Sequence, residues 1–266
     1  MDHKKETDLK RISELGDELY DALVNQKMLE PLTDRETNLT IEDAYQISTR
    51  LLERRLDAGE KLIGKKIGVT SKAVQNLLNV HQPDFGYLTD AMVCQDGIIP
   101  ITEKMIQPKA EGEIAFILKK DLKGPGVTTA DVLQATDFVV PCFEIVDSRI
   151  RDWKIKIQDT ISDNASCGYF ALGNQTANPK KLDLSTVGMV VEKNGHVVAT
   201  GAGAAALGSP LTCVAWLANT LGQFDISLKA GEVILSGSLV PLIPVESGDH
   251  MTVHIGGIGS TSLCFE

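Results

Sequence analysis

The sequence predicts an α+β protein with a small helical region over residues 1–60 and a larger β-rich domain over residues 61–266. Apolar residues recur at helical spacing before residue 60, which is typical of amphipathic helices. Beyond it, short apolar runs alternate with glycine, proline and aspartate, as in a succession of strands and turns. Hydrophobic residues make up 43% of the chain, enough for a substantial core.

Two helices open the predicted fold. Their apolar residues recur every three or four positions, at Ile12, Leu15, Leu19 and Leu23 in the first and at Ile41, Ala44, Tyr45, Leu51, Leu52 and Leu56 in the second. Thr40 and Asp43 resemble a capping box with Asp in place of the usual Glu, so the second helix is expected to begin next to Thr40. The link over residues 30–39 contains Pro31 and is expected to be a loop.

Two further helices are expected in the β-rich part. One follows Thr128 and ends near Ala135. The other has Ser209 as a potential cap and Pro210 in its first turn, and it is expected to end at Gly222.

Strands are predicted where apolar runs are short and bounded by turn residues. Asn194 and Gly195 lie between two such runs, which predicts a hairpin. The predicted strands cover residues 113–118, 138–146 across Pro141, 187–192, 196–200, 232–236, 251–255 and 260–265.

The charge of the chain limits its partners. The formal net charge is −10 and no basic cluster is interleaved with aromatic residues, so nucleic acid and anionic membrane surfaces are poor partners. An anionic substrate would need a local cation or a metal ion. No apolar run reaches 18 residues, the charged N-terminus is unlike a signal peptide, and the five cysteines are scattered. These features predict a cytoplasmic protein without a transmembrane helix.

Three carboxylates form the candidate site. Glu111 and Glu113 flank Gly112 at the entry to a predicted strand, where alternate residues share one face, and Glu144 lies in a second apolar strand. An ordinary alternative is a solvated strand edge, with Glu144 paired to Arg149 or Arg151. Spacing alone favours that alternative, because the pattern E-x-E is common.

The surrounding segments change this balance. Residues 107–116 (QPKAEGEIAF), 231–238 (GEVILSGS), 248–249 and 256–260 resemble the metal-binding strand and the C-terminal signature of the fumarylacetoacetate hydrolase superfamily. Residues 64–71 (GKKIGVTS), 147–150 (DSRI) and 163–166 (DNAS) are similar to its hydratase/decarboxylase branch in catechol meta-cleavage. The resemblance implies a fumarylacetoacetate-hydrolase-like fold of mixed β-sheets, or a β-roll, behind the helical N-terminal region.

Within this branch, hydratases and decarboxylases compete. Residues 81–87 (HQPDFGY), 155–160 (IKIQDT) and 164–168 (NASCG) resemble the hydratase versions. We therefore expect hydration of a small 2-hydroxydienoic or 2-oxo acid, with decarboxylation, or a non-catalytic partner subunit, as the alternatives. The matched metal-site motifs contain no histidine, so hydrolysis of a diketone is not expected.

The resemblance also implies a site. Glu111, Glu113 and Glu144 would hold a divalent metal, and carboxylates without histidine or cysteine favour Mg²⁺ or Mn²⁺. Lys66 is the candidate second cation and Asp84 the proton shuttle or base. Their ordinary alternatives are a surface lysine beside Lys65 and a turn residue after Pro83.

The remaining implied roles are less direct. Asp163 and Asn164 are the candidates for orienting substrate or water, and Ser166, Gly237 and Ser238 are the candidates for binding the substrate. The resemblance further implies a homo-oligomer and an association with the decarboxylase of the same branch.

Overall fold

The computed structural model describes residues 2–94 and 96–266. The helical N-terminal region comprises α1 (Asp2–Val24), the short α2 (Leu32–Arg35) and α3 (Ile41–Asp57), which confirms the two long predicted helices. Thr40 and Asp43 form the expected capping box, with the Asp43 N–H donating to Thr40 Oγ1 over 3.1 Å. The link was predicted to be a loop, but it holds α2, whose Leu32 is buried among apolar residues of α1 and α3.

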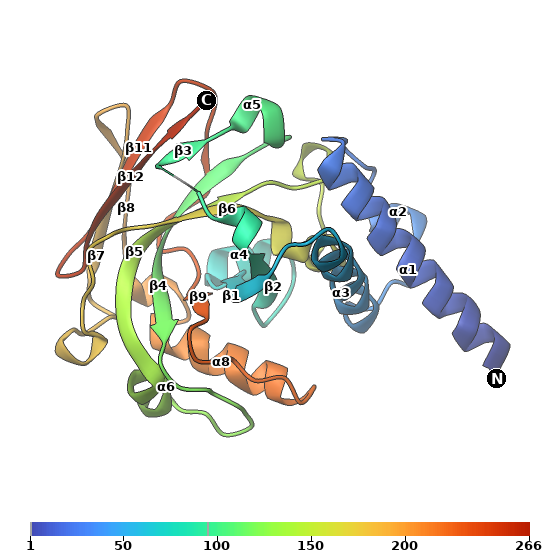
Figure 1. Cartoon of the computed structure of the whole chain (residues 1–266), viewed down its shortest axis with the longest axis horizontal. Coiled ribbons are helices and arrows are strands. Elements are labelled where there is room, and N and C mark those ends of the chain that lie inside the picture. Colours follow the sequence, from blue (N-terminus) through green and yellow to red (C-terminus); the bar gives the residue numbers. More distant parts are fainter. Residues whose placement is uncertain (1, 95) are drawn as a thin grey trace.

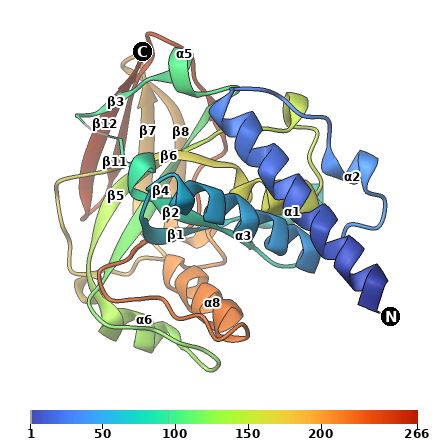
Figure 2. The same cartoon turned by 45° about the vertical axis from the view of Figure 1, so that its right-hand side comes forward.

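The three helices lie on one side of the strands. Figures 1 and 2 show α1 packed along α3, and the N-terminal end of α1 extends away from the molecule. The apolar stripes of the two helices meet in a separate cluster that contains Leu15, Leu19, Ile47 and Leu51. The boundary at residue 60 between this region and the rest remains a prediction.

A seven-stranded mixed sheet forms the centre of the molecule, in the order β2-β1-β9-β4-β5-β6, with β10 paired to β4. β1 and β9 run parallel, and the other pairs are antiparallel. Its strands are β1 (Leu62–Gly68), β2 (Asp84–Thr89), β4 (Lys109–Leu118), β5 (Thr136–Val146), β6 (Cys167–Leu172), β9 (Val233–Leu235) and β10 (Ile243–Pro244).

A second, five-stranded sheet packs against β5. Its order is β3-β12-β11-β7-β8, and the main core includes apolar residues from both sheets. The predicted hairpin joins β7 and β8 through Asn194 and Gly195, both at positive φ, as a two-residue hairpin turn requires. The strands are β3 (Ile98–Ile99), β7 (Gly188–Lys193), β8 (His196–Ala202), β11 (His250–Ile255) and β12 (Gly259–Phe265).

The later helices lie among the strands of the β-rich part. They are α4 (Lys72–Leu77), α5 (Ile101–Lys104), α6 (Thr129–Ala135), α7 (Ile157–Ser162) and α8 (Pro210–Gly222). Of these, α6, α7 and α8 contact β5, β2 and β1 of the central sheet. α6 and α8 match the predicted segments, although the Ser209 side chain makes no cap hydrogen bond and Gly222 still belongs to α8. The segment Gly203–Gly222 is long and apolar enough to cross a membrane by composition, yet Val214, Leu217 and Leu221 are buried in the main core. We interpret α8 as a core helix.

Several strands are longer than the sequence predicts, and two of them, β4 and β5, shape the site. β4 begins at Lys109, so Glu111 lies within the strand and not at its entry. β5 continues through Pro141 without a break. The proline carbonyl accepts a hydrogen bond from Gly173 N over 2.8 Å, so the strand remains tied at this residue to the segment that follows β6.

Candidate functional site

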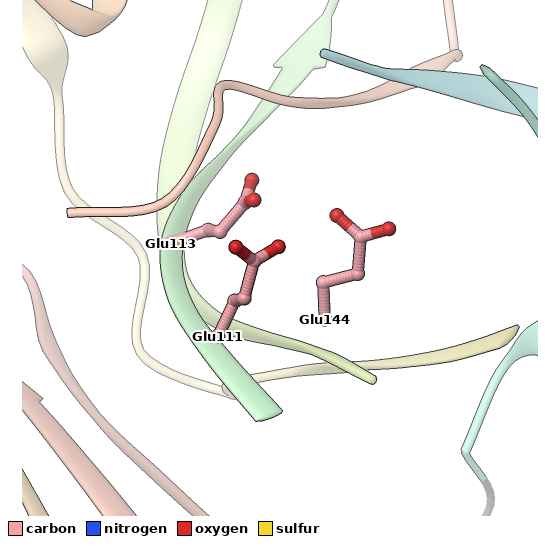
Figure 3. Close-up of side chains that lie close together, drawn as sticks. All are labelled: Glu111, Glu113 and Glu144. Carbon is pink, nitrogen blue, oxygen red and sulfur yellow. The ribbon is translucent and has the colours of Figure 1, made fainter. Parts of the chain in front are cut away.

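The three glutamates converge from two neighbouring strands. Glu111 of β4 lies directly opposite Glu144 of β5, and Glu113 follows two residues later on the same face of β4. One carboxylate oxygen from each lies within 4.8 Å of the others, and Figure 3 shows all three carboxyl groups pointing into one space. Glu113 and Glu144 are fully buried, whereas Glu111 keeps some exposure at the adjoining cavity.

Few donors compensate these buried charges. Glu113 Oε2 accepts a hydrogen bond from Gly237 N over 2.9 Å, but its Oε1 has no partner among the described residues. Removal from water, followed by repulsion from Glu144, raises the pKa of Glu111 to about 8. The same two causes raise the pKa of Glu113 well above its ordinary range.

The ordinary alternative for Glu144 is wrong. Its Oε1 lies 3.1 Å from Lys66 Nζ. The arginines named as alternatives have other partners: Arg149 Nε pairs with Asp163 over 2.5 Å, and Arg151 Nε with Glu30 over 2.7 Å. The register of the central sheet thus brings β1 to Glu144, in place of the arginines that are near in sequence.

Lys66 is also no surface lysine. It is almost fully buried in β1, and its ammonium donates to the Ala165 carbonyl over 2.9 Å. Burial opposes its charge, but Glu144, Asp84 and Glu111 raise the pKa of Lys66 above its ordinary value, so it is a fixed cation. The neighbouring Lys65 points elsewhere and pairs with Glu232 over 2.6 Å.

Asp84 begins β2 and is buried beside Lys66. It lies opposite Gly68 of β1, where a Cβ would come close to the Asp84 carboxylate and within 3.3 Å of Lys66 Nζ. Within the described part of the chain, neither Asp84 oxygen accepts a well-formed hydrogen bond. Burial raises the pKa of Asp84 to about 6, although the Lys66 ammonium opposes the rise. A carboxyl group that titrates near neutral pH is suited to proton transfer.

These residues adjoin a cavity of about 430 Å³. Lys66, Asp84, Glu111, Ser166 and Ser238 form part of its wall. Lys66 is the sole cation among the described residues that line it. Most of the remaining wall is apolar and comes from α4, from Trp153 and Ile155, and from residues 239–242.

The other predicted site residues differ in their surroundings. Ser166 and Ser238 line the cavity, with Ser238 Oγ donating to the Val240 carbonyl over 2.6 Å. Gly237 directs its N–H to Glu113. Asp163 and Asn164 are not among the lining residues: Asp163 pairs with Arg149, and the Asn164 side chain bonds both backbone groups of Tyr87.

Asn164, Ala165 and Ser166 form a left-handed turn, with φ values of 55°, 50° and 55°. This conformation costs about 1–2 kcal/mol per residue for side chains other than glycine, so several surrounding contacts must maintain it. We refer to Asn164–Ser166 as the left-handed turn. Sequence reasoning missed its Ala165 carbonyl as a partner of Lys66, because a backbone acceptor has no signature in the residue type.

The residues present fit a hard divalent cation. Four buried or half-buried carboxylates and one ammonium carry a formal charge of −3 when all are ionised, and Glu113 Oε1 lacks any donor. Oxygen ligands of this kind are those that Mg²⁺ and Mn²⁺ prefer. Glu111, Glu113 and Glu144 are the group that could hold the ion, and Lys66 and Asp84 lie beside them on the cavity.

Comparisons with known proteins agree with this geometry. The family model for the fumarylacetoacetate (FAA) hydrolase C-terminal region matches residues 66–265. The chain is 70% identical to a 2-hydroxypent-2,4-dienoate hydratase of Pseudomonas putida over 81% of this chain and 98% of that protein. It is 57% identical to a 2-hydroxyhexa-2,4-dienoate hydratase of Comamonas testosteroni over 97% and 99% of the two chains.

Among solved structures, 4-oxalocrotonate decarboxylase from Pseudomonas putida G7, complexed with magnesium and adipate, superposes with a TM-score of 0.93. The two chains are 37% identical, and the match covers 97% of this chain and 98% of the other. The predicted fumarylacetoacetate-hydrolase-like fold is therefore confirmed.

Proposed function

This chain belongs to the fumarylacetoacetate hydrolase family, and we propose that it is a hydratase that converts 2-hydroxypenta-2,4-dienoate (2-oxopent-4-enoate) to 4-hydroxy-2-oxopentanoate in the meta-cleavage pathway. The observation that carries the proposal is the glutamate cluster with Lys66 and Asp84 beside it, in a chain whose curated relatives are named as hydratases. As a hydro-lyase it would add water to a carbon–carbon double bond without a redox step.

A divalent metal, Mg²⁺ or Mn²⁺, would be held by Glu111, Glu113 and Glu144. When bound, it would act as a Lewis acid toward the oxygens of the substrate and offset their negative charge. This resolves the difficulty of an acidic protein that must bind an acid.

Lys66 would provide the second positive charge. Both stages of the reaction place negative charge on the C2 oxygen: first when the dienol ketonises and C5 takes a proton, and again when water adds at C4 and C3 takes a proton. Because the Lys66 ammonium is buried and fixed by its contacts, it can stabilise this charge without reorganising.

Asp84 would move the proton. With a pKa of about 6 it is mostly ionised at neutral pH, so it can accept a proton from the attacking water and return one to carbon. Ser166 and Ser238 line the cavity and would contact the substrate through their hydroxyl groups. Asp163, Asn164 and Gly237 would support the site indirectly, since their polar groups bond protein atoms.

The decarboxylase alternative is less well supported. Its substrate, 2-oxohex-3-enedioate, carries a second carboxylate, and an anion in an apolar surrounding is costly without a cation. Of the described residues on the cavity wall, Lys66 is the single cation. A non-catalytic partner subunit is also less well supported, because such a subunit has no need of three converging carboxylates.

The proposed assembly and location follow from the resemblance of the sequence to its family. We propose a cytoplasmic homo-oligomer that associates with 4-oxalocrotonate decarboxylase. Gel filtration with light scattering, alone and with that decarboxylase, would measure both associations.

The test of the function is direct. Purified protein with Mg²⁺ or Mn²⁺ should consume 2-hydroxypenta-2,4-dienoate and form 4-hydroxy-2-oxopentanoate, and EDTA or Glu113→Gln should abolish turnover. Failure of the metal-loaded protein to consume this acid would refute the proposal. Release of CO₂ from 2-oxohex-3-enedioate would identify the decarboxylase instead.

A further inference from the structure

The Lys66 ammonium is a single positive charge that lies near several carboxylates. Glu144, Asp84 and Glu111 all attract it, and a flexible lysine side chain could lean toward any of them. A neutral group also contacts it, the Ala165 carbonyl at 2.9 Å. Together with Glu144 at 3.1 Å, this carbonyl fixes where the ammonium stands on the cavity wall.

The left-handed turn places the Ala165 carbonyl beside Lys66. Two sets of hydrogen bonds, here called clasps, maintain the turn. In the first, Asn164 Oδ1 accepts from Tyr87 N over 2.7 Å and Asn164 Nδ2 donates to the Tyr87 carbonyl over 2.9 Å. This bidentate contact ties the turn to β2. Strained backbone of this kind persists only where the surroundings determine it, and such strain is concentrated at functional sites.

The second clasp fixes the residue before the turn. Arg149 is fully buried; its backbone N–H donates to Asp163 Oδ2 over 2.9 Å and its Nη2 donates to the Asp163 carbonyl over 2.7 Å. At the other end of the turn, Asp147 N donates to the Ser166 carbonyl over 2.8 Å. Both ends of the turn are therefore tied to the segment that follows β5.

Gly86 makes the close approach possible. The β1–β2 register places Gly86 opposite Lys66, and a Cβ on Gly86 would lie 2.5 Å from the Asn164 carbonyl oxygen. A side chain at this position would push the turn away from β2, and the Ala165 carbonyl with it.

We propose, on the basis of the hydratase function above, that the left-handed turn positions Lys66 for catalysis and that Asn164 is a positioning residue acting through the Ala165 carbonyl. Asn164 itself does not touch the substrate. Its loss would let the ammonium move toward the carboxylates, and a displacement of about 1 Å at a reacting group can lower a rate on the order of 100-fold.

A double-mutant cycle tests the proposal. Asn164→Ala should lower kcat about 10- to 100-fold with a smaller change in KM, because positioning acts on the transition state. In the Lys66→Ala background the same change should cost less than about threefold, since the group that it positions is already gone. An equal loss in both backgrounds would mean that Asn164 acts independently of Lys66, and would overturn the proposal.

The chain offers a matched control for lost stability. Asn219 makes the same bidentate contact with Val127, over 2.8 and 2.9 Å, between α8 and the segment before α6. Asn219→Ala should lower Tm in the same way and leave kcat unchanged well below Tm. If Asn219→Ala lowers kcat as much as Asn164→Ala, the effect is one of general stability and the proposal is wrong.

A second readout does not depend on turnover. Oxalate, a small chelating diacid, can be titrated into the Mn²⁺-loaded variants by calorimetry, and its Kd should show the same coupling between residues 164 and 66. If the oxalate Kd values of the wild type and the variants show this coupling, but the wild type does not hydrate the dienoate, the proposed function fails and the positioning stands. Oxalate binding that Lys66→Ala leaves unchanged would overturn the positioning. If Asn164→Ala does not fold, Gly86→Ala displaces the turn from its other side and should give the same pattern.

Discussion

Metal binding at the glutamate cluster should weaken steeply as the pH falls below 8. The cluster brings three carboxylates within 4.8 Å, and its repulsion is relieved either by a cation or by protons. Removal from water and repulsion from Glu144 raise the pKa of Glu111 to about 8, so the metal-free protein holds a proton there at neutral pH. A metal must displace this proton, because only the ionised carboxylate is a good ligand.

The size of the effect follows from that proton. Displacement of one proton weakens apparent affinity about tenfold for each pH unit below the pKa, so the Glu111 proton alone should raise the Kd for Mn²⁺ roughly 100-fold from pH 8 to pH 6, and the Glu113 proton adds to this rise. Glu111 keeps some exposure at the cavity wall, and solvent screening there reduces its share of the effect. Above pH 8 the contribution of Glu111 should level off.

Calorimetry can measure both the affinity and the proton. Titration of Mn²⁺ at pH 6, 7 and 8, in two buffers with different ionisation enthalpies, gives the Kd and the number of protons released. We expect between one and two protons per metal at pH 7, because the pKa of Glu113 is raised as well as that of Glu111. A Kd that stays within threefold from pH 6 to pH 8, with no proton release, would refute the electrostatic account of the cluster.

Three further predictions concern the neighbouring residues and the cavity. Burial raises the pKa of Asp84 from 3.8 to about 6, so its charge destabilises the fold progressively between pH 4 and 6 and fully above pH 6. Asp84→Asn should therefore stabilise the metal-free protein by up to about 3 kcal/mol at pH 8, by less at pH 5 and hardly at all at pH 4. Equal Tm values of the variant and the wild type at pH 8 would contradict this. Lys66→Met leaves the buried Glu144 without its cation, so it should lower the free energy of unfolding of the metal-free protein by about 3–5 kcal/mol. Urea unfolding in EDTA would measure this loss. An unchanged urea midpoint would contradict a stabilising ion pair between Lys66 and Glu144. Because the cavity wall is largely apolar, the protein should accept 2-hydroxyhexa-2,4-dienoate with a kcat/KM within about tenfold of that for the five-carbon acid. For the dicarboxylate 2-hydroxyhexa-2,4-dienedioate, kcat/KM should be lower on the order of 100-fold. Steady-state kinetics showing equal kcat/KM for the dicarboxylate would contradict this account of the cavity.

Local chemistry explains which elements could be predicted from the sequence. The capping box at Thr40 marks where α3 begins, and Asn194-Gly195 marks the hairpin, because in both cases the residues that form the structure are adjacent. The long apolar periods of α1, α3 and α8 depend on burial of one face and are visible for the same reason. These elements form the framework, and none supplies a side chain of the catalytic centre.

The strands that supply Lys66 and Asp84 were missed, and the reason is physical. β1 and β2 contain buried charged residues where a structural strand would have apolar ones, so the alternation that identifies a strand is absent. β6 was missed as well, since glycine and tyrosine interrupt its short apolar run. The charged residues that the site requires therefore removed the sequence pattern by which β1 and β2 could have been recognised as strands.

The partner of Glu144 shows the remaining limit of the sequence. Proximity along the chain suggests Arg149 or Arg151, and a buried carboxylate does need a cation. Sheet register decides otherwise, since β9 joins β1 to β4, and β4 lies against β5, so that Lys66 reaches across to Glu144. Arg149 instead holds Asp163 and the left-handed turn that contacts Lys66. Arg149, which the sequence suggests as a direct partner of Glu144, thus acts on Glu144 indirectly. It holds the turn that positions Lys66, and Lys66 pairs with Glu144.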